Sequence, residues 1–438
     1  GAVHLTQLPT AIDGYVGRRL YRSQANGAAP FLLVADLNAS ATSFVDLGID
    51  QGAELIERES VINYRLDASL VINPGVVLKL DGARIDVGVG AQMLAEGRDG
   101  NELVITSVND RRFGAAGSFD TVKQGVVVEE ATAGDWGGLY ASPASRISID
   151  HSVVAYGGGN TRIEGDYASF NVIEVQQAEA RIANSKFENN AAGMSNPGGD
   201  RIGRGSISES TIFVRGSEAI IIKNELVNNL GPAISIDVNS LNARHVTDIG
   251  RSTQGGVSPQ IIIQSENGEL WDSGNLIEGV DEFYGLGNQG ALVRDNVIED
   301  NGLNGMHVRG GTLTTEGVWD DTDIVHVVFD TIYVTDFHTA GGLRLESAPD
   351  ESLVVKLDGE NAGFTATGNP LDITDRIGGS LNIIGQQGKP VVITSVADDT
   401  VGAGYLTSGM LQVDTNGDSR VEINDELLET TRINVTYS

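Results

Sequence analysis

The chain has 438 residues, with 29 Lys or Arg against 60 Asp or Glu, and its formal net charge at pH 7 is −31. A surface this acidic argues against nucleic acid as a partner and, unless calcium bridges the charges, against polyanionic glycans, because such partners need cationic groups. The absence of Cys excludes a disulfide framework, and no apolar run approaches the ~20 residues of a membrane-spanning helix.

Residues 1–65 form the first predicted region, a segment of short strands. Three β-prone runs, 15–22, 31–37 and 42–46, are separated by the turn-rich stretches SQANGAAP and NAS. The pattern YRS…G…F…A.L…TSF.D.G within this region resembles the second half of a fibronectin type III module. Half of a β-sandwich leaves an apolar face uncovered. We therefore expect the segment to pack on the following region or to be completed by a neighbouring chain.

Residues 66–410 are expected to form one long body made of two related units. Residues 76–82 (VVLKLDG) recur as residues 353–359 (LVVKLDG), and residues 104–110 (VITSVND) recur as residues 392–398 (VITSVAD). Self-similarity of this kind is typical of repeat architectures, whose units bury their apolar faces against each other. The 56 glycines and an aromatic content of only 5% suit many short strands joined by tight turns.

Three segments of this body share apolar residues followed by a pair of corner residues. The inward apolar positions are Phe187, Leu226 and Ile298, which precede Asn189-Asn190, Asn228-Asn229 and Asp300-Asn301, and a second apolar set follows at Met194, Ala233 and Met306. The intervals between the inward positions, 39 and 72 residues, correspond to roughly two and three coils of ~20–25 residues each. Asn tolerates the left-handed backbone of tight corners and can stack its amide along successive coils. Short strands without hairpin partners pair in parallel between coils, which predicts an all-β, right-handed parallel β-helix.

Longer stretches of the body carry a family resemblance. VINPGVVLKLDG (71–82), LVITSVNDRRFGAAGSFDT (103–121), GDWGGLYASPASRISIDHSVVAYGG (134–158) and the second-unit stretch 372–404 resemble the repeats of large bacterial surface proteins. Those proteins belong to the right-handed parallel β-helix superfamily of pectate-lyase type. The resemblance implies the architecture rather than an activity, because the superfamily mixes polysaccharide lyases, hydrolases and non-catalytic surface proteins.

The third region, residues 411–438, contains a candidate calcium loop. Its proposed oxygen ligands are Asp414, Asn416 and Asp418 at loop positions 1, 3 and 5, the Arg420 carbonyl at position 7 and Asp425 at position 12. This spacing resembles the calcium loops of EF-hand and dockerin proteins, which gather 6–8 oxygens around one hard cation. Ser419 stands where the usual turn Gly would be, and Asp425 replaces the usual Glu. We expect calcium to be the cofactor, in a structural rather than a catalytic role.

Two other features allow a ligand interpretation and a plainer one. Asp320, Asp321 and Asp323 could bind calcium but lack full loop spacing, so we favour a solvated strand cap. Trp136, Trp271 and Trp319 could form a sugar-stacking platform. The glycines that flank Trp136 instead favour a buried indole between closely packed coils.

A catalytic site is harder to place. Acidic residues are too numerous to single out the pair of carboxylates that glycoside hydrolysis needs. His307 and Arg309 are the best candidates for a lyase-type base, and Asp150 with His151 is a weaker pair. Polar residues that alternate along a strand normally face solvent, so we favour a non-catalytic role for both pairs.

These observations favour a non-catalytic structural protein of the extracellular space or cell surface, acting in adhesion, in a surface layer or in fibres. The expected partners are further copies of the chain in head-to-tail contact, neighbouring repeats of a longer chain, or surface glycans, because the ends of a β-helix present open strand edges. We expect neither nucleic-acid binding nor membrane insertion. The alternative is a polysaccharide-active enzyme or carbohydrate-binding protein that uses one long face of the body.

Overall fold

The computed structural model describes residues 3–6, 8, 17–23, 31–48, 68–113, 130–193, 206–241, 290–314, 316–336, 342–368, 379–420 and 432–437. The chain divides into two compact units, Gly1–Tyr64 and Arg65–Ser438. Nearly all regular structure in the described residues is β-strand; the single helical element is a 3₁₀ turn, η4 (Val238–Ser240).

The N-terminal unit contains two antiparallel strand pairs. The strand β1 (Val3–Thr6) pairs with β4 (Ser43–Asp46), and β2 (Gly17–Ser23) pairs with β3 (Phe31–Asn38). In their described residues the β-prone runs 15–22, 31–37 and 42–46 therefore overlap β2, β3 and β4. An ion pair of 2.6 Å between Arg22 and Asp46 joins β2 to β4.

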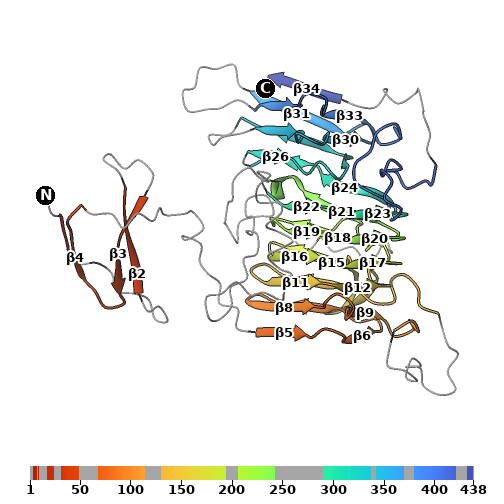
Figure 1. Ribbon diagram of the computed structural model, residues 1–438, viewed down its shortest axis with the longest axis horizontal. Coiled ribbons are helices and arrows are strands. Elements are labelled where there is room, and N and C mark those ends of the chain that lie inside the picture. The colour runs from red at the N-terminus through yellow and green to blue at the C-terminus, as the bar shows by residue number, and fades with distance from the viewer. Residues whose placement is uncertain are drawn as a thin grey trace. The chain divides into compact units, whose positions relative to one another are not determined.

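The second unit consists of strands stacked in parallel sheets, as Figure 1 shows. Sheet A contains β5 (Ala68–Ile72), β8 (Ala91–Glu96), β11 (Arg146–Asp150), β16 (Glu179–Ala183), β19 (Ile220–Ile222) and β22 (Leu292–Arg294). Sheet B contains β6 (Val77–Leu80), β9 (Leu103–Ser107), β12 (Ser152–Ala155), β17 (Lys186–Glu188), β20 (Glu225–Val227) and β23 (Val297–Glu299). In both sheets each strand pairs with its counterpart from the next passage of the chain.

The described residues of this unit form three further parallel sheets. Sheet C contains β7 (Ile85–Val87), β10 (Leu139–Ala141), β15 (Ile173–Gln176), β18 (Ile212–Arg215), β21 (Pro232–Asp237), β24 (Leu303–Arg309), β27 (His326–Val328), β30 (Val354–Leu357) and β33 (Val392–Ser395). Sheet D contains β25 (Gly311–Thr312), β28 (Thr331–Val334), β31 (Gly363–Gly368) and β34 (Arg432–Tyr437), and sheet E contains β26 (Gly317–Trp319), β29 (Leu343–Glu346) and β32 (Leu381–Ile384).

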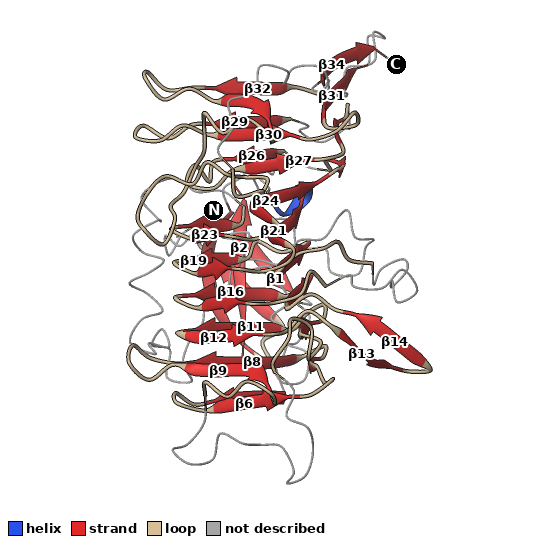
Figure 2. Ribbon diagram, turned by 90° about the vertical axis from the view of Figure 1, so that its right-hand side faces the viewer, coloured by secondary structure: helices blue, strands red, loops and turns tan. Residues whose placement is uncertain are grey.

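The chain visits these sheets in a repeating order. From β5 to β24 the order is A, B, C; from β25 onwards it is D, E, C. We call one such passage a rung. The one described exception within this unit is the antiparallel hairpin of β13 (Asn160–Ile163) and β14 (Asp166–Ser169), which projects from the stack in Figure 2. Parallel strands that recur in this order are compatible with a β-helix.

The core lies between the sheets and is built from rows of aligned apolar side chains. Phe187, Leu226 and Ile298 are buried and in direct register on neighbouring strands of sheet B. Each of the two intervals is therefore a single rung, and the expectation of two and three coils between these residues is wrong, because the rungs here are longer than ~20–25 residues. Ala233 and Met306 are buried as well, whereas Met194 lies outside the described residues. Each buried Leu, Ile or Phe contributes about 2 kcal/mol, and a single rung cannot bury such a row without its neighbours.

The corners between sheets B and C carry the predicted Asn ladder. The first residue of each corner pair has a left-handed backbone, with φ of 56° at Asn189, 54° at Asn228 and 54° at Asp300. The second residues bond to one another: Asn190 Nδ2 donates to Asn229 Oδ1 at 2.8 Å, and Asn229 Nδ2 donates to Asn301 Oδ1 at 2.7 Å. A parallel ladder of Ser185, Asn224 and Asn296 joins sheets A and B.

Loss of one ladder amide should therefore be costly. We expect Asn229→Ala to lower the free energy of unfolding by about 2–4 kcal/mol, because buried donors and acceptors on both neighbouring rungs lose their partner. Asn382→Ala, at an exposed position on β32, is the matched control and should change it by less than about 0.5 kcal/mol. Denaturant unfolding measures both; equal effects would contradict a structural role for the ladder.

The two recurring sequences form equivalent two-strand modules on different sheets. In sheet B the module is β6 with β9, where Lys79 aligns with Thr106; in sheet C it is β30 with β33, where Lys356 aligns with Thr394. In each copy the Thr hydroxyl donates to the Asp four residues later, at 2.7 Å in the first and 2.6 Å in the second. The same sequence thus forms the same pairing close to both ends of the stack.

Candidate functional site

The proposed calcium loop belongs to a segment that crosses the free edge of sheet B. We call residues 401–420 the edge strap. Tyr405 forms a parallel bridge with Val297, and its carbonyl accepts the N–H of Ile298 at 3.3 Å. Gln412 Nε2 donates to the Ile298 carbonyl at 2.7 Å. The strap therefore supplies hydrogen-bond partners to β23, the last strand of this sheet.

The described part of the loop is closed by hydrogen bonds from backbone N–H groups to its own carboxylates. The Asp414 carboxylate accepts the N–H groups of Asp418 at 3.2 Å and Ser419 at 2.9 Å. Asp418 accepts the N–H of Arg420 at 2.8 Å and the side-chain amide of Asn416 at 2.9 Å. Ser419 has φ of 60°, so it adopts the left-handed conformation that Gly usually provides at loop position 6.

Among the loop residues that the structure describes, one buried side-chain oxygen has no hydrogen-bond partner. The Oδ1 atom of Asn416, at loop position 3, is buried and accepts no hydrogen bond. A buried acceptor without a donor is unfavourable, and a hard cation would satisfy it. Asp425 lies outside the described residues. Among the described residues no three or more His, Cys, Asp or Glu are grouped for metal binding; the loop there contributes two carboxylates and the Asn416 amide.

The electrostatics of the loop also favour a bound cation. Burial raises the pKa of Asp414, the N–H of Ser419 opposes this, and the nearby charge of Asp418 raises it further. A carboxylate that is shielded from water and close to like charge is stabilised by a bound cation. Asp414, Asn416 and Asp418 therefore suit a calcium ion.

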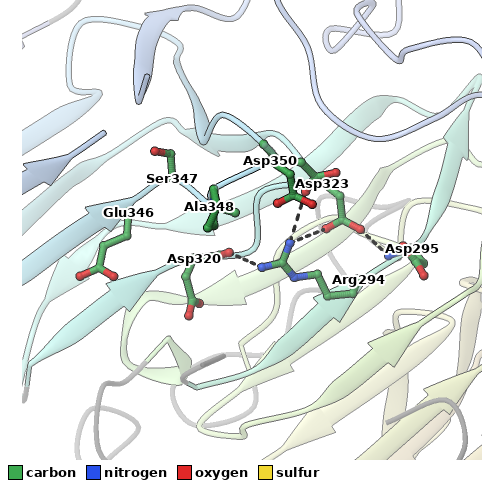
Figure 3. Close-up of a pocket in the computed structure, with 10 residues that line it drawn as sticks. Arg294, Asp295, Asp320, Asp323, Glu346, Ser347, Ala348 and Asp350 are labelled. Atoms are coloured by element: carbon green, nitrogen blue, oxygen red, sulfur yellow. Dashed lines mark hydrogen bonds and ion pairs between the residues drawn. The ribbon is translucent and has the colours of Figure 1, made fainter. Parts of the chain in front are cut away.

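A second polar cluster surrounds Arg294 at the end of β22, shown in Figure 3. The guanidinium donates to the Asp320 carbonyl and, at 2.8 Å, to Thr322 Oγ1. It lies within 3.6 Å of Asp321, 3.7 Å of Asp323 and 3.6 Å of Glu351. A pocket of about 270 Å³ opens beside it.

Asp320, Asp321 and Asp323 were expected to form a solvated strand cap. This expectation is wrong for Asp321 and Asp323, whose side chains are shielded from solvent. Asp321 is 0% exposed and Asp323 is 8% exposed. Asp321 does cap a strand, because its Oδ1 accepts the N–H of Val293 at 3.0 Å where sheet A ends. Because the sheet order changes after β24, no described strand follows β22 in sheet A. The buried carboxylate of Asp321 takes the place of that strand.

Burial and charge pairing oppose each other in this cluster. Burial raises the pKa of Asp321 well above its ordinary value and that of Asp323 to about 6, although Arg294 opposes both shifts. Burial lowers the pKa of Arg294, but the surrounding carboxylates, Asp321 first, outweigh it and raise that pKa overall. The cluster is thus a buried ion network that ends sheet A, not a set of free ligands.

A third polar site lies on the outer face of sheet C. Arg215 on β18, Asp237 on β21 and Arg309 on β24 lie at neighbouring positions across the sheet. The guanidinium carbons of Arg215 and Arg309 lie over the Phe213 ring, at 5.2 and 4.1 Å from its centre. Arg309 Nη1 donates to Ser235 Oγ at 2.8 Å and its Nη2 lies 3.8 Å from Asp237. The pocket here measures about 350 Å³ and includes His307.

The strand positions of His307 and Arg309 suggested that both side chains face solvent. In the structure both are instead half-buried in this pocket. Burial, with help from Arg309, lowers the pKa of His307 to about 4, so its ring is neutral at pH 7. Burial lowers the pKa of Arg309 to about 10, so it stays a cation. A neutral imidazole beside two cations suits the binding of an anionic or hydroxyl-bearing group. The repeated triplet Val-Arg-Gly at 214–216 and 308–310 is the sequence signal for this pairing.

The remaining candidates have structural partners. Asp150 accepts hydrogen bonds from Arg181 at 2.8 Å and Asn184 at 2.9 Å and contacts His151 Nδ1 at 2.7 Å. Trp136 is buried and donates to the Ala155 carbonyl at 2.8 Å, as the flanking glycines predict. Trp319 is also buried, stacked on His326 with ring centres 5.1 Å apart. Trp271 lies outside the described residues. Neither described Trp can serve as a sugar platform.

Comparisons with known proteins add no family assignment. No protein family, no curated protein and no solved structure matches the chain at a significant level. In the part of the chain that the structure describes, no helix has the length and apolar character needed to cross a bilayer.

Proposed function

We propose that this chain is a non-catalytic structural protein of the cell surface or extracellular space, and that its body is a right-handed parallel β-helix stabilised by calcium. Its work would be adhesion, surface coating or fibre formation, through head-to-tail contact between copies. Parallel strands in fixed register, a net charge of −31 and the geometry of the 414–420 loop support this proposal. Charge of this size keeps the free chains soluble while end contacts form.

The exposure of core rows at both ends of the stack is the observation that carries the proposal. Leu70 on β5 is in register with Met93 and Ile147, which are 0% exposed, yet Leu70 is 45% exposed. At the other end, Ile383 on β32 continues the row of Trp319 and Leu345 and is 47% exposed. Solenoids without polar caps tend to associate through such surfaces.

A second copy of the chain is the occupant that suits these ends. All sheets of the stack are parallel, so the free edge at β32 and β33 runs in the same direction as the edge that β5, β6 and β7 present. Head-to-tail contact would continue rows that are apolar on both sides. The contact is heterologous, and it extends into fibres unless the rotation closes a ring.

Two end variants test this contact. We expect the wild type to form end-to-end particles in sedimentation and electron microscopy, and Leu70→Asp or Ile383→Asp alone to stop growth, because each puts a charge into an apolar contact. Mixing the two variants should give dimers and no longer particles, since each keeps one intact end. Val89→Asp, at an exposed turn position, is the control and should assemble normally. A wild type that stays monomeric at all concentrations would overturn the proposal.

The pocket of Arg215, Asp237 and Arg309 favours a second candidate, a carbohydrate-active or carbohydrate-binding face. Two guanidiniums over one aromatic ring, beside a neutral His, suit an acidic or sulfated sugar. Titration calorimetry with uronate and sulfated oligosaccharides should then show binding that Arg309→Met removes. Chain cleavage in the same mixture would identify an enzyme, and the absence of binding would remove this candidate.

A further inference from the structure

The pocket on the outer face of sheet C takes charged side chains of both signs from three consecutive strands. Arg215 ends β18, Asp237 ends β21 and Arg309 ends β24, and these strands are neighbours in the middle of sheet C (Figure 1). Asp237 is in direct register with Arg309. The pocket measures about 350 Å³, which is near the lower end of the range for ligand pockets. It therefore suits one small unit rather than a long chain.

The protein itself holds both guanidinium groups in place. Arg309 Nη1 donates to Ser235 Oγ at 2.8 Å, and its Nη2 donates to the Val214 carbonyl. Arg215 Nη2 donates to the Ser206 carbonyl. A cation that is already ordered loses little conformational entropy when it binds an anion. The two guanidiniums are thus preorganised for an anionic group.

Asp237 is a fixed carboxylate beside these cations. Its Oδ1 atom accepts the Gly216 N–H at 2.7 Å and the Ser240 hydroxyl at 2.6 Å, and it lies 3.8 Å from Arg309 Nη2. Its Oδ2 atom is buried, and no donor among the described residues bonds to it. One oxygen therefore fixes the carboxylate, while the other keeps its negative charge without a hydrogen-bond partner.

The other titratable groups that line the pocket change this balance little. Burial, with help from Arg309, lowers the pKa of His307 to about 4, so the ring is neutral at pH 7. Burial lowers the pKa of Arg309 to about 10, Asp237 opposes this, and the like charge of Arg215 adds to it, so Arg309 stays a cation. Asp330 also lines the pocket, but it is exposed and screened by water. A ligand meets two cations and one fixed carboxylate at close range.

We propose that this pocket selects singly charged oxyanions, the carboxylate or sulfate ester of one sugar-sized unit, and that Asp237 excludes phosphate esters by charge. This inference rests on the carbohydrate-binding candidate above and adds a rule for its ligand. At pH 7 a carboxylate or a sulfate ester carries one negative charge, whereas a phosphate monoester carries nearly two.

The charge rule follows from how two energies depend on the charge of the ligand. The cost of removing an ion from water rises with the square of its charge, whereas attraction to fixed charges rises only in proportion. Asp237 cancels part of the attraction from Arg215 and Arg309. The remaining attraction offsets the desolvation of a monoanion but not that of a dianion, which is discrimination by a built-in repulsive group.

Three derivatives of one sugar test this rule: glucuronate, glucose 6-sulfate and glucose 6-phosphate, with glucose as the neutral control. Sulfate and phosphate groups share a tetrahedral shape, so comparing them separates charge from fit. Titrations at pH 7, followed by NMR of the ligand, should show that the wild type binds glucuronate and the sulfate at least about tenfold more tightly than the phosphate. Arg309→Met should weaken the binding of all three charged probes, which assigns the binding to this pocket.

Asp237→Asn removes the repulsive charge and keeps the hydrogen bonds of the site. Asn retains an oxygen for Gly216 and Ser240, and its amide takes the position of Oδ2, which has no donor to lose. Interaction with a fixed charge is proportional to the charge of the ligand. The gain in affinity for the phosphate should therefore be the square of the gain for the sulfate, about hundredfold against about tenfold. Asp81→Asn, at an exposed turn outside the pocket, is the control and should change neither affinity.

The outcomes distinguish this rule from the candidate function on which it rests. If neither the oligosaccharides nor the three charged probes bind to the wild type, the carbohydrate-binding candidate and the charge rule fail together. If oligosaccharides bind but the probes do not, or if sulfate and phosphate bind equally well, the rule alone is overturned. An unchanged ratio of the two affinities in Asp237→Asn also overturns it. Denaturant unfolding checks that each variant is folded.

Discussion

Arg294→Met should lower the free energy of unfolding of the body by about 3–5 kcal/mol at pH 7. This is the largest loss that we expect from a single substitution at a buried position. Arg294 is the cation among Asp321, Asp323 and Glu351, and Asp321 is fully buried. Removing the guanidinium leaves carboxylates without compensation in a region of low polarity. Equilibrium unfolding in denaturant gives the loss directly. The loss should be smaller at pH 5, where the orphaned carboxyl groups can bind protons.

Arg344→Met is the matched control for this substitution. Arg344 pairs with Glu316 at 3.3 Å and Glu346 at 3.0 Å, but its side chain is about a third exposed. Ion pairs in contact with water contribute less than about 1 kcal/mol, so Arg344→Met should hardly change the free energy of unfolding. Equal losses for the two variants would show that the Arg294 network does not hold the end of sheet A.

The second large effect concerns pH and His326. This side chain lies in a core row between Met306 and Val355, and burial lowers its pKa from 6.5 to about 3. As pH falls from 7 to 5, the His of the unfolded chain binds a proton whereas the buried one does not, so acid favours unfolding. This one group should reduce stability by about 2 kcal/mol over that range.

His326→Phe isolates this contribution. Phe keeps the ring stacked on Trp319 and cannot bind a proton. The stability difference between variant and wild type should therefore shift by about 2 kcal/mol in favour of the variant between pH 7 and pH 5. Asp323, whose raised pKa acts in the opposite direction, and Arg294, which faces His326, are present in both proteins and cancel in the comparison. A difference that does not depend on pH would refute the buried neutral state.

The local features of this fold could be predicted from the sequence, because they depend on a few adjacent residues. Short β-prone runs bounded by turn residues predicted strands, and the corner pairs predicted left-handed turns with stacked amides at Asn190 and Asn229. The left-handed backbone at Ser419 agrees with its assignment to loop position 6. Each of these follows from backbone sterics or from side-chain hydrogen bonding over a short stretch of chain.

The features that escaped prediction depend on where distant segments meet. Asp321 is buried because it accepts a hydrogen bond from Val293, and the strap covers β23 from more than a hundred residues away. Arg215 and Arg309 meet because both lie on sheet C with Asp237 between them in register. No local pattern reports which strand is the last in its sheet, so the burial of these polar groups could not be read from the sequence.

Sheet C is the one sheet that continues through every rung from β7 to β33 in the described chain, whereas sheets A and B stop at β22 and β23. The two blocks of the stack therefore share a single continuous hydrogen-bonded spine. A break in that spine near β24 would uncouple their melting, and a calorimetric trace with one peak would become a trace with two.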